Sequence, residues 1–312
     1  MDRDSILYKL RRKGQVIARY IVPLDLLSKM YHFIVLKKKL NLKNPQSFNE
    51  KIQWMKLYYC PHNPLVVECS DKYKVREYVK EKGLEHILVK VLGSWLNANE
   101  IDFFGGGGAD KFVLKCNHGC AYNIICENKN VLDKQATIKQ LNKWLKEDFG
   151  AFNLELHYSK IEPRRIICEE YLGKNLIDYK FFCFDGIPKF VYISEGLIHD
   201  RQAKIGFYNL DGRKMEIQYS HYADLDNIKF SSAFDAMLKD AKTLSKDFKF
   251  VRVDFFLVEK RYYFAELTFT PGGGMMKIFP ERIDYEWGKL LNINDLIEGK
   301  SGNKRNGNRK SI

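Results

Sequence analysis

Two neighbouring segments late in the chain constrain its fold most. Residues 250–258 and 261–269 each have the apolar, β-branched and aromatic composition of a strand, and only a tight turn separates them. Side chains two residues apart lie on the same face of a strand. If the strands pair as a hairpin, one face gathers a cation, two carboxylates and a hydroxyl. These residues are Arg252 and Asp254 on the first strand and Glu266 and Thr268 on the second.

Such a face has two interpretations. Carboxylates on a rigid sheet suit Mg²⁺, which binds a few protein ligands together with phosphate oxygens. Arg252 would then offset the repulsion between the carboxylates and steady a phosphoryl group. The alternative is a set of ion pairs on an exposed sheet face, and this segment alone does not decide between them.

The rest of the chain mixes helical and strand patterns and predicts an α+β fold. A capping box at residues 47–50 opens a helix that runs to about Tyr59. Further helices are predicted over residues 71–82, 134–147 and 233–247. Residues 86–95 are predicted to form a short strand and a turn. Further strands are predicted over residues 111–116, 123–127, 165–172, 178–185 and 188–195, the last two joined by the hairpin turn Asp185-Gly186.

Composition and turn signals divide the chain into five predicted parts, with no internal repeat. The four glycines at 105–108 are interpreted as a flexible connection, because no Lys-Ser/Thr follows them. The parts are a basic helical segment (1–43), a helical and small α/β part (44–110), a smaller sheet-bearing subdomain (111–175), a larger subdomain with the carboxylate strands (176–297) and a disordered basic tail (298–312).

The net charge of +13 belongs to the two ends of the chain. Residues 1–39 hold ten basic and three acidic side chains, and residues 299–312 hold five basic and no acidic ones. The middle of the chain is therefore almost neutral. A nucleic-acid binder carries its basic face on the folded body, so we expect no nucleic-acid partner. Basic ends fit an anionic membrane or an anionic glycan, or serve solubility alone.

Residues 5–40 have the pattern of one or two basic amphipathic helices that break near Pro23. Either the helices dock on the body, or they contact a membrane surface. No run approaches the ~20 apolar residues of a membrane span, and the first residues do not read as a secretory signal. The seven cysteines are odd in number and resemble buried free thiols. We therefore expect a cytoplasmic protein, peripheral at the inner membrane face if the helices bind lipid.

Short motifs along the chain resemble those of ATP-grasp ligases, in the same order. Residues 45–54 (Pro-Gln-Ser-Phe-Asn-Glu-Lys-Ile-Gln-Trp) and 114–119 (Leu-Lys-Cys-Asn-His-Gly) resemble more narrowly the TupA-like ATP-grasp family, named for teichuronopeptide synthesis. The resemblance covers about residues 40–290. The broader motifs are the start of the ATP-grasp module (71–76), the strand lysine and phosphate loop (112–123), the adenine hinge strand (167–172), the strand pair after it (178–186) and the metal-binding end (252–272).

The resemblance implies an ATP-grasp fold, in which two α+β subdomains clamp ATP between their sheets, and it implies roles for single residues. Nucleotide contacts are implied for Lys72, Arg76, Lys115, His118, Gly119, Glu169, Tyr171, Leu172 and Asp178. Catalytic contacts are implied for Arg252, Lys180 and Arg201, and one or two Mg²⁺ ions for Asp254, Glu266 and Thr268. Three residues have plainer alternatives: Lys115 as a solvent-facing lysine, Glu169 as one of a surface pair and Asp178 as a strand-start cap.

The implied activity is that of an ATP-dependent carboxylate–amine ligase that works through an acyl phosphate. Its expected substrates are a small-molecule or glycan-linked carboxylate, such as a uronic acid, and an amine or amino acid, in surface polysaccharide biosynthesis. Two alternatives stay open. Asp224-Leu-Asp226 fits a glycosyltransferase of the same kind of pathway, and Thr268, where many ATP-grasp enzymes have Asn, fits a module that binds ATP without turnover.

Overall fold

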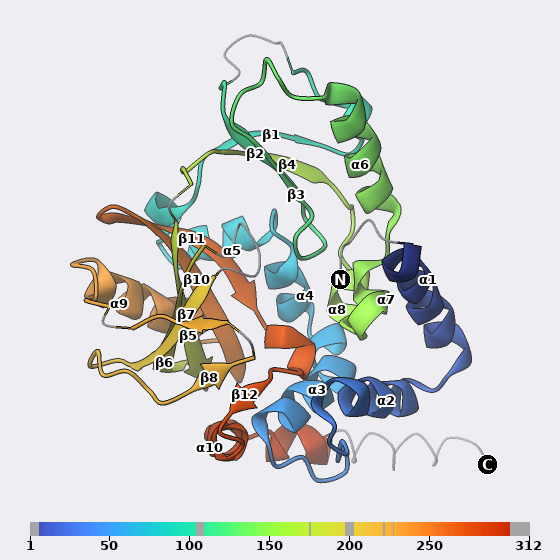
Figure 1. The fold of residues 1–312 in the computed structure, drawn as a ribbon, viewed down its shortest axis with the longest axis vertical. Helices are drawn as coiled ribbons and strands as arrows, with labels where there is room; N and C mark the ends of the chain where they lie inside the picture. The colour runs from blue at the N-terminus through green and yellow to red at the C-terminus, as the bar shows by residue number, and fades with distance from the viewer. Residues whose placement is uncertain are drawn as a thin grey trace.

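The computed structural model describes residues 6–103, 109–174, 176–196, 203–220, 222–226 and 228–299. A small sheet and a large sheet face each other, and helices cover both (Figure 1). This arrangement confirms the predicted α+β class. The four-glycine segment and residues 300–312 of the predicted basic tail lie outside the described residues. Residues 298–299, which the sequence predicts as the start of the disordered tail, instead end a helical stretch.

The small sheet has the strand order β1-β4-β2-β3, and all its pairs are antiparallel. Helix α6 (Lys134–Lys146) packs on it, with Leu141 in the core and Trp144 stacked on Tyr122. The sequence predicts that the smaller subdomain begins at residue 111, but its sheet also includes the earlier strand β1. Its strands are β1 (Val91–Trp95), β2 (Phe112–Cys116), β3 (Asn123–Cys126) and β4 (Ile166–Glu170).

The large sheet has the order β11-β10-β5-β6-β7-β9, antiparallel except for the pair β7–β9. The predicted β5–β6 hairpin turn is present, with positive φ angles at Asp185 and Gly186. A two-residue pair, β12 (Ile278–Phe279) with β8 (Gln218–Tyr219), lies apart. The strands of the large sheet are β5 (Ile177–Phe184), β6 (Ile187–Glu195), β7 (Lys204–Asn209), β9 (Ala223–Asp224), β10 (Phe250–Val258) and β11 (Arg261–Thr268).

Alternation along β5 divides the large sheet into two faces. Tyr179 and Phe181 point to helix α9 (Phe234–Ser245), where both rings contact Phe234. Phe182 and Phe184 point to the other face and contact Phe48. The start of the strand carries Asp178 and Lys180 on this second face. One face of one strand therefore supplies the aromatic core at one end and charged groups at the other.

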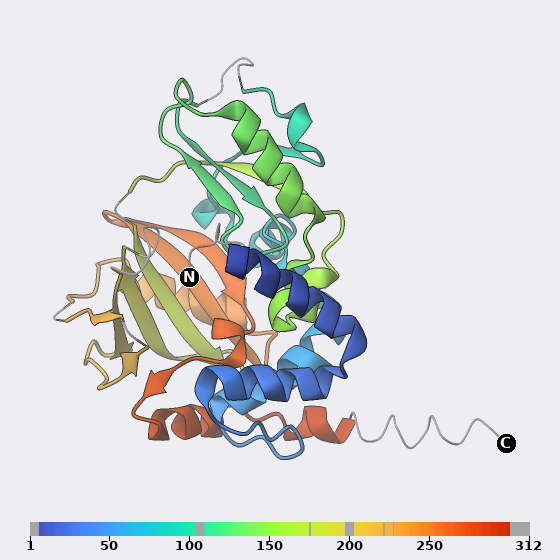
Figure 2. The ribbon, with the colours of Figure 1, turned by 45° about the vertical axis from the view of Figure 1, so that its right-hand side comes forward.

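The N-terminal helices lie on the side of the molecule opposite α9 (Figure 1). Helix α1 (Ile6–Ile21) packs over α7 (Phe149–Asn153), and α2 (Leu24–Leu36) packs on α3 (Phe48–Tyr58) (Figure 2). The predicted break at Pro23 and the predicted capping box of α3 are both present. No helix in the described ranges has the length and apolar character of a membrane span.

Helix α5 begins later than the sequence predicts, at Val75 instead of Asp71. The carboxylate of Asp71 accepts hydrogen bonds from the backbone N–H groups of Tyr73 and Lys74, which favours a turn over a helical start. The remaining helices are η1 (Cys60–His62), α4 (Pro64–Ser70), α5 (Val75–Glu81), η2 (Glu85–Ile87), η3 (Ala98–Glu100), α8 (Leu156–Ser159), η5 (Pro271–Gly274) and α10 (Arg282–Leu290), with a last helical stretch at 294–299.

A polar stripe on α3 holds the loop that follows β11. Its members are Asn49, Gln53 and Lys56, which lie on one helical face and are almost completely buried. The Asn49 side chain exchanges two hydrogen bonds with the backbone of Met276. Gln53 donates to the carbonyls of Gly273 and Gly274, and Lys56 donates to that of Gly273 at 2.8 Å. The stripe fixes a loop in which residues 272–274 all have positive φ, a conformation that glycine adopts without strain.

We predict that Asn49→Ala destabilises the protein by about 3 kcal/mol, because it leaves a buried N–H and a buried C=O of Met276 without partners. Denaturant unfolding measures the change. Asn130→Ala, at an exposed position, is the matched control and should be neutral. Equal stability of the two variants would show that the stripe does not hold the loop.

Candidate active site between the two sheets

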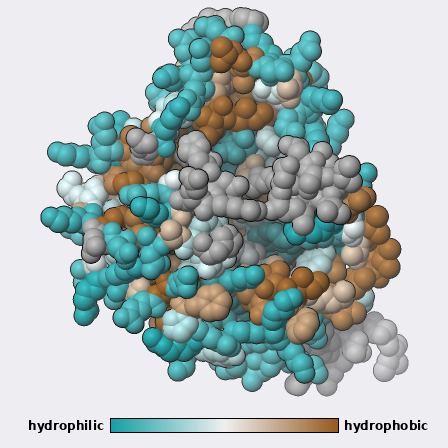
Figure 3. All heavy atoms as spheres, viewed as in Figure 1, coloured by the Kyte–Doolittle hydropathy of each residue, from teal (hydrophilic) through white to brown (hydrophobic). Residues whose placement is uncertain are grey.

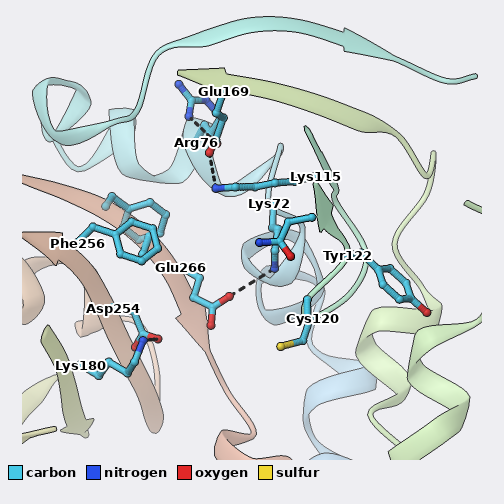
Figure 4. A pocket seen from close by; sticks show the side chains of 14 residues that line it. Lys72, Arg76, Lys115, Cys120, Tyr122, Glu169, Lys180, Asp254, Phe256 and Glu266 are labelled. Atoms are coloured by element: carbon cyan, nitrogen blue, oxygen red, sulfur yellow. Dashed lines mark hydrogen bonds and ion pairs between the residues drawn. The ribbon is translucent and has the colours of Figure 1, made fainter. Parts of the chain in front are cut away.

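A solvent-accessible pocket lies between the small sheet and the β10–β11 hairpin. Figure 4 shows Lys115 and Glu169 on one wall and Asp254, Lys180 and Glu266 on the other. Seven of the residues predicted from the sequence line it: Lys72, Arg76, Lys115, Glu169, Lys180, Asp254 and Glu266.

The predicted hairpin brings its four polar side chains together. Arg252 pairs with Thr268 across the two strands, and Asp254 pairs with Glu266. The Arg252 guanidinium donates two hydrogen bonds to the Asp254 carboxylate, at 2.7 and 2.5 Å, and one to the Thr268 hydroxyl at 3.0 Å. It also lies 3.5 Å from Glu266. The Thr268 hydroxyl in turn donates to Glu266.

Lys180 joins this cluster from the neighbouring strand β5. It stands opposite Asp254 in the β5–β10 register, and its Nζ lies 3.3 Å from that carboxylate. Its second partner is Asp178, two residues earlier on the same face, at 2.7 Å. Asp178 also accepts a hydrogen bond from Ser194. The resemblance implies a nucleotide contact for Asp178, whereas in the structure its carboxylate pairs with Lys180 and positions it.

Asp254 and Glu266 differ in their electrostatic surroundings. Asp254 has no exposed surface, and this burial raises its pKa even though Arg252 and Lys180 favour the charged form. Burial also acts to raise the pKa of Glu266, but Lys72, Arg252 and Lys180 outweigh it and hold that pKa at about 2. Glu266 is therefore an ionised carboxylate on the pocket wall at neutral pH.

The small sheet supplies the opposite wall. Lys115 and Glu169 lie on the adjacent strands β2 and β4, and their side chains meet at 2.5 Å. Arg76, from α5, lies 3.7 Å from the other oxygen of Glu169 and donates to the carbonyl of Val89. The Lys115 ammonium is thus held at the pocket by a carboxylate, which excludes its interpretation as an unconstrained surface lysine.

Lys72 connects the two walls. Its Nζ lies 3.4 Å from Glu266, and its backbone N–H donates to the carbonyl of Asn117 at the end of β2. The Asn117 side chain is buried and bonds Asp71, next to Lys72, as well as the N–H of Arg165. Asn117, which the sequence gives no role beyond its motif, therefore fixes the position of Lys72.

His118 does not reach the pocket. Its ring is fully buried, and Nε2 contacts the carbonyl oxygen of Trp144 in α6 at 3.0 Å. Burial lowers its pKa to about 4. The predicted nucleotide contact of this side chain is replaced by a packing role. A Cβ at Gly119 would lie 2.8 Å from the Tyr122 ring, so close packing also requires this glycine.

Two other predicted residues, Tyr171 and Leu172, do not line the pocket. The Tyr171 hydroxyl bonds Glu127, and Leu172 follows it on the segment after β4. Their predicted contact with adenine is through the backbone, which the side-chain positions do not test. Arg201 lies outside the described residues.

Sequence reasoning missed several residues of the pocket lining. Phe256 lies on β10 two residues after Asp254, so strand alternation alone places it on the pocket face. Cys120 and Asn123 come from the β2–β3 connection and from the start of β3. Both lie inside the motif at 112–123, but the resemblance assigns neither of them a role of its own. Phe264 and Ala265 lie at the irregularity in the β10–β11 register, which alternation does not predict.

The donor set fits Mg²⁺ bound together with a phosphate. The hairpin offers two carboxylates and the Thr268 hydroxyl, all hard oxygen ligands. Within the described ranges, no group of three or more His, Cys, Asp or Glu side chains has the arrangement of a self-sufficient metal site. Oxygen atoms from a substrate would have to complete the coordination, which is how Mg²⁺ is held at phosphate sites.

We predict that Arg252→Met destabilises the protein by about 3 kcal/mol, because it strips the buried Asp254 carboxylate of its bidentate partner. Chemical denaturation at neutral pH measures the loss. The double variant Arg252→Met/Asp254→Asn should recover part of it, since it removes the unpaired charge. A single variant as stable as the parent would contradict the pairing.

The chain is similar to one protein family and to several solved structures. The model of the TupA-like ATPgrasp family matches residues 50–292. No curated protein matches the chain significantly. Its similar solved structures include the D-alanine–D-alanine ligase of Helicobacter pylori, at 15% identity and a TM-score of 0.44, covering 79% of this chain and 66% of that one. Another is the L-amino acid ligase of Bacillus licheniformis, at 13% identity and a TM-score of 0.43, covering 75% and 51%.

The chain thus spans between about half and two thirds of the length of these two structures. The family match covers more than half of the chain, including both sheets and every pocket residue named above. The family predicted from the motifs is confirmed, and with it the predicted fold. The chain belongs to the TupA-like ATP-grasp family.

Proposed function

We propose that this protein is an ATP-dependent ligase that joins a carboxylate to an amine and forms ADP. The observation that carries the proposal is the pocket between the sheets, where cations from both walls face an ionised Glu266 and a buried Asp254. Pockets of this kind serve a polyanionic substrate with a divalent cation. Membership of an ATP-grasp family supports ATP as that substrate.

In the proposed reaction a carboxylate attacks the γ-phosphate, ADP leaves, and an amine then displaces phosphate from the acyl phosphate to give an amide. Mg²⁺ would neutralise charge on the phosphates. Asp254 and Glu266 would hold the ion, and Thr268 would adjoin it. Lys115 and Lys72 would bind phosphate oxygens, while Arg252 and Lys180 would stabilise charge that develops on the transferred group. No nucleophilic side chain is required.

For the substrates we propose a uronic acid or another glycan-linked carboxylate and an amine or amino acid, as in surface polysaccharide biosynthesis. The resemblance to a family named for teichuronopeptide synthesis supports this choice. We place the reaction in the cytoplasm at the inner face of a membrane. Seven cysteines without disulfides and a strongly basic N-terminal segment support that location.

The glycosyltransferase alternative has less support. Asp224 and Asp226 both pair with Lys214 on the exposed surface, and neither lines the pocket. Within the described residues, this Asp-x-Asp therefore forms a surface ion pair. The other alternative, a module that binds ATP without turnover, differs from the ligase only in catalysis. The ADP-release assay described below distinguishes the two.

We predict that Asp254→Asn and Glu266→Gln each lower turnover by about a hundredfold or more, because each removes a proposed cation ligand. The assay is ADP release from Mg²⁺-ATP with uronic acids and amino acids added in pairs. Asp224→Asn is the matched control. If the protein is a ligase, Asp224→Asn should release ADP at the rate of the parent. If the parent instead turns over a nucleotide sugar and Asp224→Asn loses that activity, the glycosyltransferase would be favoured.

Lys115→Ala should weaken ATP binding roughly tenfold to a hundredfold, the worth of a charge-assisted hydrogen bond. Titration calorimetry measures the affinity.

Normal turnover in either carboxylate variant would contradict the site assignment. Mg²⁺-dependent ATP binding by the parent, without ADP release for any substrate pair, would favour the inactive module.

A further inference from the structure

Helices α1 and α2 carry an apolar surface that faces away from the body. We call it the outer face and define it by Leu10, Ile17 and Ile21 on α1 and Leu26, Met30 and Phe33 on α2. Their side chains are between 46% and 74% exposed. Apolar side chains gather at the right-hand edge of the molecule, where α1 passes into α2 (Figure 3). Contiguous apolar patches mark interaction sites on proteins.

The outer face is not an unfinished part of the core, because each helix packs its opposite side against the body. On α2 the inward residues are Leu27, Ser28 and His32, each no more than 2% exposed. On α1, Arg19 forms an ion pair with Asp148, and the guanidinium of Arg12 stacks over the Phe152 ring. Both helices are therefore docked, as one of the two interpretations predicts, and still present a second apolar surface.

Basic residues surround the outer face. Exposed cations on or beside it are Arg11 and Lys13 on α1, Lys29 on α2, and Lys37 and Lys39 after α2. Residues 10–39 contain eight basic side chains and one acidic side chain, Asp25. An apolar strip flanked by lysine and arginine is the pattern of a helix that lies in the plane of a membrane interface.

We propose that the outer face binds an anionic phospholipid bilayer, with α1 and α2 lying on its surface. The six apolar side chains enter the boundary between headgroups and acyl chains, and the basic side chains contact lipid phosphates. A second copy of this chain fits less well. A two-fold contact pairs a patch with itself, and here it would oppose two clusters of like charge. The inference concerns the location of the protein and holds whether or not the pocket is a ligase.

Vesicle flotation of the full chain tests the proposal. The parent should float with phosphatidylcholine vesicles that contain phosphatidylglycerol, bind weakly to phosphatidylcholine alone, and dissociate as salt is raised. Ile17→Gln/Phe33→Gln should lower the partition coefficient at least tenfold, by the loss of apolar burial. Lys13→Gln/Lys29→Gln/Lys37→Gln should lower it on the order of a hundredfold at low salt.

Two matched variants act as controls away from the outer face. Val131→Gln removes an apolar side chain that is 79% exposed, and Lys239→Gln removes an exposed charge on α9. Both should float like the parent. Circular dichroism and thermal unfolding of every variant check that the fold is kept, since all the changed side chains are exposed.

The proposal is overturned if the parent does not float with anionic vesicles, or if the two multiple variants float as it does. It is also overturned if sedimentation without lipid shows a dimer that Ile17→Gln/Phe33→Gln dissociates, because the outer face would then bind a second copy.

Discussion

The buried carboxylate of Asp254 is the constraint on which the site depends. A charge without exposed surface is tolerated only with close partners of opposite sign. Arg252 meets this need from the same face of β10, and Lys180 meets it from the opposite position on β5. Asp178 then offsets Lys180. The order β11-β10-β5 at the edge of the large sheet is therefore also the order of a charge network, and pairing the strands assembles the site.

A second constraint connects the N-terminal part of the chain to this network. The loop after Thr268 contains three successive glycines with positive φ, and it keeps that form through hydrogen bonds from Asn49, Gln53 and Lys56. Lys56 is only 1% exposed, and this burial lowers its pKa to about 8. The motif at residues 45–54 thus lies far in sequence from the loop that continues from the carboxylate strand, yet it shapes that loop.

How much of the site the sequence predicts depends on the distance between partners along the chain. Strand alternation was enough to place Arg252, Asp254, Glu266 and Thr268 on one face, because the hairpin is local. It does not reach the pairs Lys72–Glu266 or Lys115–Glu169, which depend on how separate elements pack. His118 shows the limit within a motif. It lies three residues after Lys115, but the packing of α6 against β2 turns its ring towards the Trp144 carbonyl and away from the pocket.

The tightness of the ion pairs distinguishes the two carboxylates of the hairpin. Both oxygens of Asp254 accept hydrogen bonds from Arg252, so a cation that binds Asp254 would have to share these oxygens with the guanidinium. Glu266 keeps a third of its side-chain surface exposed, and its two cationic neighbours stand off at 3.4 and 3.5 Å. A cation that enters the pocket could bind Glu266 without breaking a short ion pair, so Glu266 is the more accessible of the two carboxylates. In the proposed reaction Glu266 would therefore be the more accessible ligand of the cation, and Asp254 would be the ligand that also orients Arg252 and Lys180.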